Sequence, residues 1–184
     1  CIKIIIMATK KWVVDPTHSE IQFKVKHLMI TNVTGSFNIF TVDAQTDDED
    51  FSKAKISFTA DAASVNTGNE QRDGHLKSAD FFDAEKFPQL KFTATKYESV
   101  DNDGSYELYG NLTIKDVTKA IKLAVEFGGV VKDPYGNTKA GFTINGKINR
   151  KDYGLTWSAV TEAGGVVVSD EVRINCEIQL IKQQ

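Results

Sequence analysis

The residues with the clearest capacity for metal chemistry are three histidines, His18, His27 and His75. A catalytic zinc ion takes three protein ligands of this kind and leaves one position for water. The separations between these histidines match no compact zinc motif, and they fall in different kinds of predicted element. The sequence also contains no Gly-x-Ser-x-Gly elbow, no glycine-rich phosphate loop and no dinucleotide fingerprint. We therefore expect no metal, no cofactor and no catalytic residues, and we predict that the protein is not an enzyme.

A second group of polar residues is dense enough to bind an anion. Arg72, His75 and Lys77 lie within six positions of one another, beside Asp73. A guanidinium fork and a lysine could hold a diphosphate through charge-assisted hydrogen bonds. Alternatively, Arg72 pairs with Asp73 or Asp80 and only holds its own segment in place. The spacing does not decide between the two, so Arg72, His75 and Lys77 are head-group candidates.

The elements that must position these residues are strands. Apolar residues alternate with polar ones, as in Ile21, Phe23, Val25, His27 and Met29, and this period of two is typical of a strand with one dry face. Eight such runs cover residues 21–29, 33–39, 56–60, 90–94, 106–114, 121–127, 140–148 and 172–180. Turn-forming residues separate the runs at 47–50, 101–104, 116–119, 133–137 and 163–165. The pattern predicts an all-β fold, either a barrel or a sandwich.

Residues 68–88 break the alternation. Ser78 or Asp80 could cap a short helix there, and Pro88 would end it. We expect one or two short helices across one end of the strands.

The inward faces of the predicted strands carry large apolar residues beside small ones. Ala60, Ala94, Gly110 and Gly146 would leave room between aromatic walls, as a ligand pocket needs. A packed sandwich core would alternate in the same way, so the pattern alone leaves both open. If there is a pocket, we expect its lining to be Phe23, Val25, His27, Met29, Phe37, Phe58, Phe92, Leu112, Ile114, Phe142, Ile144 and Trp157. Further structural roles are expected for Arg150 with Asp152, as an ion pair or turn closure, and for Cys176, as a buried free thiol.

Size and charge narrow the class of protein further. The chain has 184 residues, 41% hydrophobic and 26% charged, with a formal net charge of −3, which suits one folded domain and offers no basic stripe for nucleic acid. The apolar run at residues 2–6 is too short for a signal peptide or a bilayer span. We expect residues 1–11 to be a partly disordered N-terminal extension, residues 12–184 to form the domain, and the protein to be cytoplasmic.

Several segments, in order, resemble the YceI-like family of polyisoprenoid-binding proteins. They are residues 12–23, the distinctive stretch NTGNEQRDGHLKSADFFD at 66–83, Phe87-Pro88 with Phe92, and residues 110–118, 148–155 and 170–172. The resemblance implies a single antiparallel eight-stranded lipocalin-like barrel. It also implies a pocket for a long amphiphile such as a polyprenyl diphosphate, a quinone or a fatty-acid derivative.

The resemblance leads to two functional hypotheses. In the first, the barrel binds, sequesters or transports an isoprenoid or other long-chain lipid, which favours the cavity over the packed core. In the second, the barrel is a non-catalytic, stress-related interaction scaffold that acts through a homodimer surface. A homodimer is expected by resemblance in either case. Many relatives are exported, so the periplasm is the alternative location.

Overall fold

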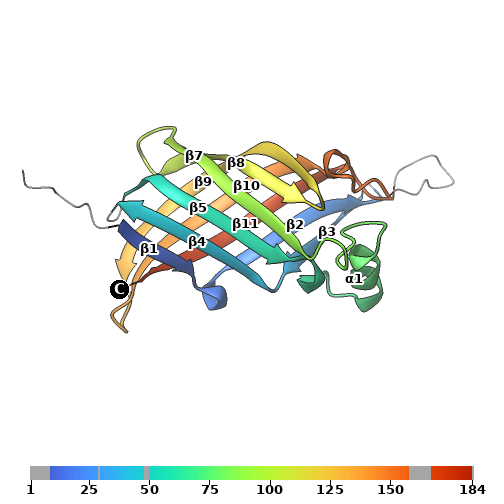
Figure 1. Cartoon of the computed structure of the whole chain (residues 1–184), viewed down its shortest axis with the longest axis horizontal. Coiled ribbons are helices and arrows are strands. Elements are labelled where there is room, and N and C mark those ends of the chain that lie inside the picture. Colours follow the sequence, from blue (N-terminus) through green and yellow to red (C-terminus); the bar gives the residue numbers. More distant parts are fainter. Residues whose placement is uncertain (1–8, 29, 48–49, 158–166, 184) are drawn as a thin grey trace, which may run out of the picture.

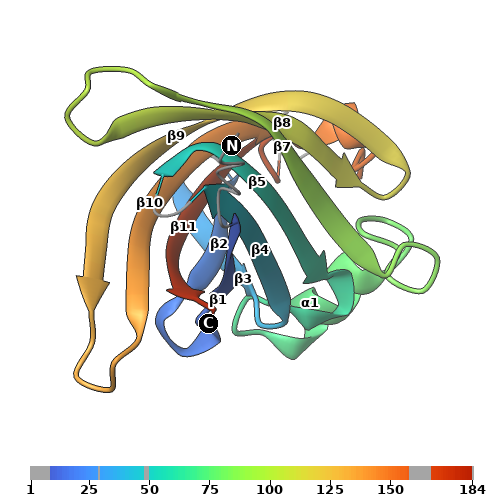
Figure 2. The same cartoon turned by 60° about the vertical axis from the view of Figure 1, so that its left-hand side comes forward.

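The computed structural model describes residues 9–28, 30–47, 50–157 and 167–183. It is a barrel of antiparallel strands with a short helix across one end (Figures 1 and 2). The strands are β1 Thr9–Val14, β2 Glu20–His27, β3 Thr31–Phe37, β4 Phe40–Asp47, β5 Asp50–Asp61, β6 Val65–Asn66, β7 Gln89–Ser99, β8 Ser105–Ile114, β9 Val117–Lys132, β10 Thr138–Asn149 and β11 Glu171–Lys182. The helix is α1 Glu70–Lys77, and single 3-10 turns are η1 Pro16–His18, η2 Ala62–Ser64 and η3 Arg150–Tyr153.

Eight strands close the barrel in the order β1-β4-β5-β7-β8-β9-β10-β11, and β11 pairs back onto β1. The β2 strand extends this wall, because β11 pairs with β1 at residues 180–182 and with β2 at residues 173–177. The β3 strand pairs with β2 and precedes β4, which pairs with β1. The predicted eight-stranded antiparallel barrel is thus confirmed. The chain bends at two places in the wall, between β1 and β2 and between β3 and β4.

The strand boundaries differ from the sequence prediction in two places. Ile39 continues an apolar alternation in the sequence, yet it lies at the bend between β3 and β4 and is 59% exposed. Near the N-terminus, Thr9, Lys10 and Lys11 pair with β4, so these three residues belong to the barrel wall and not to the expected extension. Backbone pairing, which polar side chains do not prevent, decides the second case.

The turns follow the predicted chemistry at two hairpins. Asp101 accepts hydrogen bonds from the backbone N–H groups of Asp103 and Ser105, and Asp133 accepts them from Tyr135 and Asn137. Such side-chain bonds stabilise tight turns. The turn predicted at 116–119 is shorter and lies at residues 115–116, between β8 and β9. The turn predicted at 163–165 lies outside the described residues.

The α1 helix lies across one end of the barrel, called here the helix end (Figures 1 and 2). Its N-cap is Asn69, whose side chain accepts a hydrogen bond from the Arg72 N–H at 3.0 Å. The predicted caps were wrong: Ser78 is the C-cap, and the helix ends at Lys77, well before Pro88. Within the described chain, no helix is long and apolar enough to cross a membrane.

The opposite end, where β4–β5, β7–β8 and β9–β10 turn, is called here the hairpin end. An aromatic cluster fills it, made of Trp12, Phe51, Tyr97, Tyr106, Phe127 and Phe142. Ring centroids are 5.0 Å apart for Trp12 and Phe51, and 5.1 Å apart for Phe51 and Phe142. Trp12 is fully buried, and its indole N–H donates to the Thr46 hydroxyl at 2.9 Å.

One junction of the wall is short. The β5–β7 ladder pairs residues 57–61 with 89–93 only, while β7 continues to Ser99 along β8. A register shift between Ala94 and Lys96 follows at once. Toward the hairpin end, the β7–β8 pair therefore spreads away from the β4–β5 pair (Figure 2).

Candidate functional site

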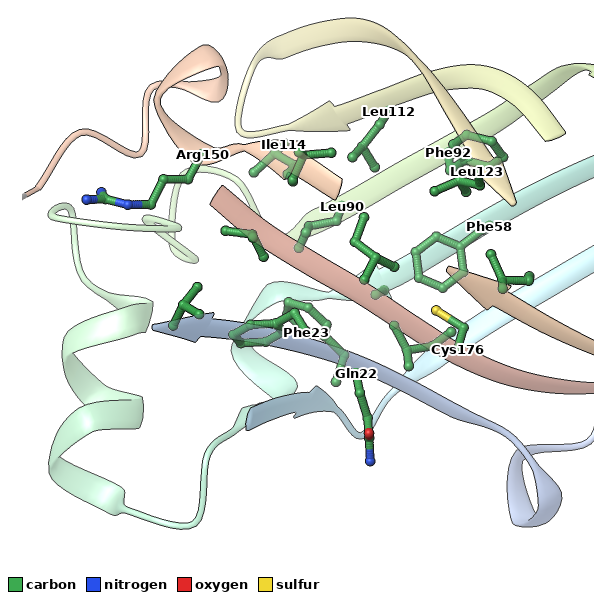
Figure 3. A pocket seen from close by; sticks show the side chains of 18 of the residues that line it. Gln22, Phe23, Phe58, Leu90, Phe92, Leu112, Ile114, Leu123, Arg150 and Cys176 are labelled. Atoms are coloured by element: carbon green, nitrogen blue, oxygen red, sulfur yellow. The ribbon is translucent and has the colours of Figure 1, made fainter. Parts of the chain in front are cut away.

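The barrel interior contains a cavity of about 420 Å³. This volume falls within the range of ligand pockets, about 300–1,000 Å³. Inward-pointing side chains from separate strands face one another across it, among them Phe23 of β2, Phe58 of β5, Leu90 of β7 and Cys176 of β11 (Figure 3). The interior is thus hollow and apolar. The alternating pattern was compatible with a packed core or a cavity, and the structure has a cavity.

The predicted lining residues are brought together. The cavity is lined by Phe23, Val25, His27, Phe37, Phe58, Phe92, Leu112, Ile114, Phe142, Ile144 and Trp157. Met29 lies outside the described residues. His27 differs in character from the others, because it is exposed at the end of β2, beside Val168. It lies at the helix end of the barrel, where the opening of the cavity is called the mouth below.

Sequence reasoning missed about twice as many lining residues as it found. They include Ile21, Val33, Val42, Phe51, Ile56, Leu76, Phe81, Phe82, Leu90, Tyr97, Leu108, Leu123, Val125, Val172, Ile174, Ile178 and Leu180. Most sit on the same alternating faces as the predicted residues, so the same signal could have found them. Phe81, Phe82 and Leu76 come from the segment around α1, where alternation gives no guide.

Of the four small residues that were expected to leave room, Ala60 lines the cavity, but Gly110 and Gly146 do not open space themselves. At Gly110, an added Cβ would lie 2.4 Å from the Phe92 ring, and at Gly146 it would lie 2.3 Å from Leu123. Gly35 is covered in the same way by the Phe23 ring, at 2.3 Å. These glycines let a neighbouring large side chain lie flat on the wall. They shape the cavity through their neighbours and do not themselves leave it open.

Arg72 lies at the helix end and lines the cavity. Its Nε donates to the Thr67 hydroxyl, and Nη2 donates to the Thr67 carbonyl, both at 2.8 Å. Asp73 accepts from the Thr67 N–H and hydroxyl instead of pairing with Arg72. Arg72 therefore does not pair with Asp73 or Asp80, as the structural alternative had it, but it does hold its own segment in place through Thr67. The side chain is held in place but exposed, as an anion-binding guanidinium at a pocket mouth would be.

His75 also lines the cavity and is fixed on three sides. Its Nε2 lies 2.9 Å from a carboxylate oxygen of Asp80, and its ring meets Phe81 and Trp157 edge-on at 5.0 and 4.9 Å. Lys77 is exposed and is not among the lining residues. The structure therefore brings two of the three head-group candidates to the mouth.

Arg150 organises the rest of the mouth. Its guanidinium is buried and donates to four carbonyls, Leu155 at 2.6 Å, Trp157 at 2.6 Å, Ser169 at 2.9 Å and Val168 at 3.4 Å. Its acidic partner is Asp170, at 3.6 Å, and not Asp152 as expected. Burial lowers the pKa of Arg150, and Asp170 opposes that shift. A guanidinium stays protonated even so, and it ties the segments on both sides of the mouth together.

The described residues offer no centre for metal chemistry. No three His, Cys, Asp or Glu side chains among them come together. His18 instead binds Asp15 at 2.8 Å, and His75 binds Asp80. Cys176 is buried and lines the cavity as a free thiol, and burial raises its pKa to about 12, so it is a neutral part of the apolar wall.

Comparison with known proteins adds the family. A model of the YceI-like domain matches residues 12–180. The UPF0312 protein SAS2572 of Staphylococcus aureus is 39% identical over 166 residues, which cover 90% of this chain and 94% of the relative. The crystal structure of a Campylobacter jejuni YCEI protein is 39% identical, with a TM-score of 0.73 over 88% of this chain and 91% of that one.

A more distant structure shares the fold alone. It is a polyisoprenoid binding domain from Saccharophagus degradans, 16% identical, with a TM-score of 0.71 over 94% of this chain and 98% of that one. The match from Trp12 to Leu180 includes the strands that enclose the cavity and the helix with Arg72 and His75. The chain belongs to the YceI-like family.

Proposed function

We propose that this protein binds and carries a long-chain amphiphile, such as an isoprenoid, with the chain in the barrel and the head group at the helix end, and that it catalyses no reaction. The observation that carries the proposal is the apolar cavity inside a closed barrel. Removing an apolar chain from water is favourable by about 0.8 kcal/mol per buried CH₂ group. The name of the Saccharophagus degradans domain, polyisoprenoid binding, supports the same class of ligand.

The placement of polar groups supports the orientation. Arg72 and His75 lie at the mouth, and His27 lies at the end of β2 beside it. The hairpin end is filled instead by the aromatic cluster. At the helix end a charged head group would find these polar side chains, whereas a charged head group against the aromatic rings would lose its hydration with little compensation.

The first experiment is native mass spectrometry of the purified protein, followed by organic extraction and lipid analysis. We expect an added mass that extracts as a polyprenyl, quinone or acyl species. Binding of geranylgeranyl diphosphate would then be measured by displacement of a fluorescent fatty acid. A bare protein that binds neither probe would overturn the proposal.

A pair of variants locates the binding. Val25 lines the cavity near the mouth, and the neighbouring Lys24 does not line it. Val25→Trp should obstruct the chain and weaken probe binding at least tenfold, whereas Lys24→Trp should leave it unchanged. Equal effects of both substitutions would place the ligand outside the barrel.

Assembly is a separate question. We expect a homodimer, and light scattering coupled to size exclusion tests it. A dimer that binds no lipid would favour the scaffold hypothesis over the carrier.

A further inference from the structure

One polar group lies at the apolar end of the cavity. Tyr97 lines the cavity and is 7% exposed, and its hydroxyl is buried. Among the described residues, this hydroxyl has no hydrogen-bond partner. Buried hydroxyls in proteins nearly always have one, because leaving a donor unpaired in an apolar setting is unfavourable.

The position of Tyr97 is far from the mouth. It is two residues from the hairpin end of β7, whereas Leu90 lies near the strand's start at the helix end. A strand rises about 3.3 Å per residue, so these two lining residues are separated by roughly 23 Å along β7. Barrel strands tilt by about 35–45°, which leaves roughly 15–20 Å along the barrel axis. A long chain anchored at the helix end would reach Tyr97 only with its distal part.

The hydroxyl is fixed and neutral. The Tyr97 ring stacks on Tyr106, with centroids 4.4 Å apart and planes 10° apart. Burial, with a smaller contribution from Tyr106, raises the pKa of Tyr97 well above its ordinary value. The group is therefore a protonated donor at every physiological pH.

A second tyrosine shows what distinguishes Tyr97. The Tyr153 hydroxyl is also buried without a partner among the described residues, but Tyr153 is not one of the residues that line the cavity. Of these two unpaired hydroxyls in the described part of the chain, the one on Tyr97 belongs to a residue that lines the cavity.

We propose that the Tyr97 hydroxyl is a second ligand-binding group, which donates a hydrogen bond to an oxygen atom on the distal part of the bound chain. The ligand class is then a long amphiphile that carries a hydroxyl, carbonyl or ether oxygen far from its head group. This inference rests on the proposed carrier function, with the head group at the helix end.

The test uses matched probes on the full chain. Saturated fatty acids from dodecanoic to octadecanoic acid and their ω-hydroxy derivatives would be titrated against the wild-type protein, Tyr97→Phe and Tyr106→Phe. The last variant is the control, because Tyr106 shares the stack but is not a lining residue. The measured quantity is the affinity ratio of each ω-hydroxy acid to its parent.

We expect this ratio to fall roughly 2- to 10-fold in Tyr97→Phe at the chain length that reaches the hydroxyl. A change of this size corresponds to the loss of one neutral hydrogen bond. Affinity for the parent acids should not change, and Tyr106→Phe should behave as wild type. The melting temperature of ligand-free Tyr97→Phe should not fall, because no protein bond is lost, whereas a purely structural hydroxyl would lower it.

Two failures are distinguishable. If the parent acids bind but the ratio is the same in wild-type protein and Tyr97→Phe at every length, the inference is wrong and the carrier function stands. If no fatty acid and no isoprenoid binds the wild-type protein, the carrier function fails and takes this inference with it.

Discussion

At the hairpin end, Trp12 and Phe51 pack ring against ring with their neighbours, and the buried indole N–H of Trp12 bonds to Thr46. At the helix end, one buried guanidinium, Arg150, holds four backbone carbonyls. Apolar packing tolerates changes of shape that keep the volume, whereas hydrogen bonding to a fixed fork does not. The two ends should therefore respond differently to conservative and to radical substitutions.

The largest effect is expected at the hairpin end. Trp12→Ala removes a fully buried ring and should lower the free energy of unfolding by about 4 kcal/mol. Trp12→Phe should recover more than half of that loss, because most of the volume remains. Urea denaturation measures both, with exposed Lys11→Ala as the control. A loss below about 1.5 kcal/mol in Trp12→Ala would mean that the cluster does not hold this end.

Arg150 should give the next largest effect. Arg150→Met leaves the carbonyls of Leu155 and Trp157 without their donor and should cost about 3 kcal/mol. Arg150→Lys should lose nearly as much, since an ammonium cannot reproduce the fork. The same urea series measures it, with exposed Lys151→Met as the control. Full rescue by lysine would show that charge alone, and not geometry, holds the mouth.

The head-group position should show in affinity and not in stability. Arg72→Gln should weaken binding of geranylgeranyl diphosphate about fivefold or more through loss of a charge-assisted contact, and should leave geranylgeraniol nearly unchanged. Lys77→Gln is the matched control, because it removes one charge from the same helix at a residue that does not line the cavity. Equal losses from both substitutions would indicate general attraction to positive charge and no defined site.

The smallest effect is a pH dependence at Asp15, the N-cap of η1, whose carboxylate bonds to Lys139 near the start of β10. Burial alone would raise the pKa of this carboxyl, but hydrogen bonds from Lys139, Thr17 and His18 outweigh it and hold the pKa well below its ordinary value. A group with a lowered pKa in the folded state stabilises the protein above its unfolded pKa of about 3.9 and loses that contribution as the pH falls.

The melting temperature should therefore drop as the pH falls from about 5 toward 2 in the wild-type protein, and the drop should be smaller in Asp15→Asn. Asp116→Asn, on an exposed turn, serves as the control. Identical pH profiles for wild type and Asp15→Asn would exclude this residue as a source of the acid sensitivity.

The strand faces were predictable because period two follows from backbone geometry, so Phe23, Phe58 and Phe142 could be assigned to the interior without any tertiary knowledge. The contacts of polar residues were not. Arg150 binds carbonyls contributed by residues after η3, and backbone carbonyls carry no sequence identity. Asn69 caps α1 although serine and aspartate nearby have similar capping ability. Tyr97 went unnoticed because a register shift precedes it on β7 and moves it onto the inner face.

The short ladder between β5 and β7 has a mechanical consequence. Beyond Ser57 and Thr93, the facing main chains of the two strands do not pair with each other, and Ile56 and Tyr97 line both the interior cavity and a groove on the outer surface. Widening the barrel there breaks no backbone hydrogen bond between those strands. The distance between β5 and β7 in this region is therefore set by side-chain packing and not by main-chain pairing. Most of the wall is closed by main-chain hydrogen bonds, whereas this part of the β5–β7 junction is closed by side chains alone. It is therefore the part of the wall that can most easily adjust to the thickness of a bound ligand.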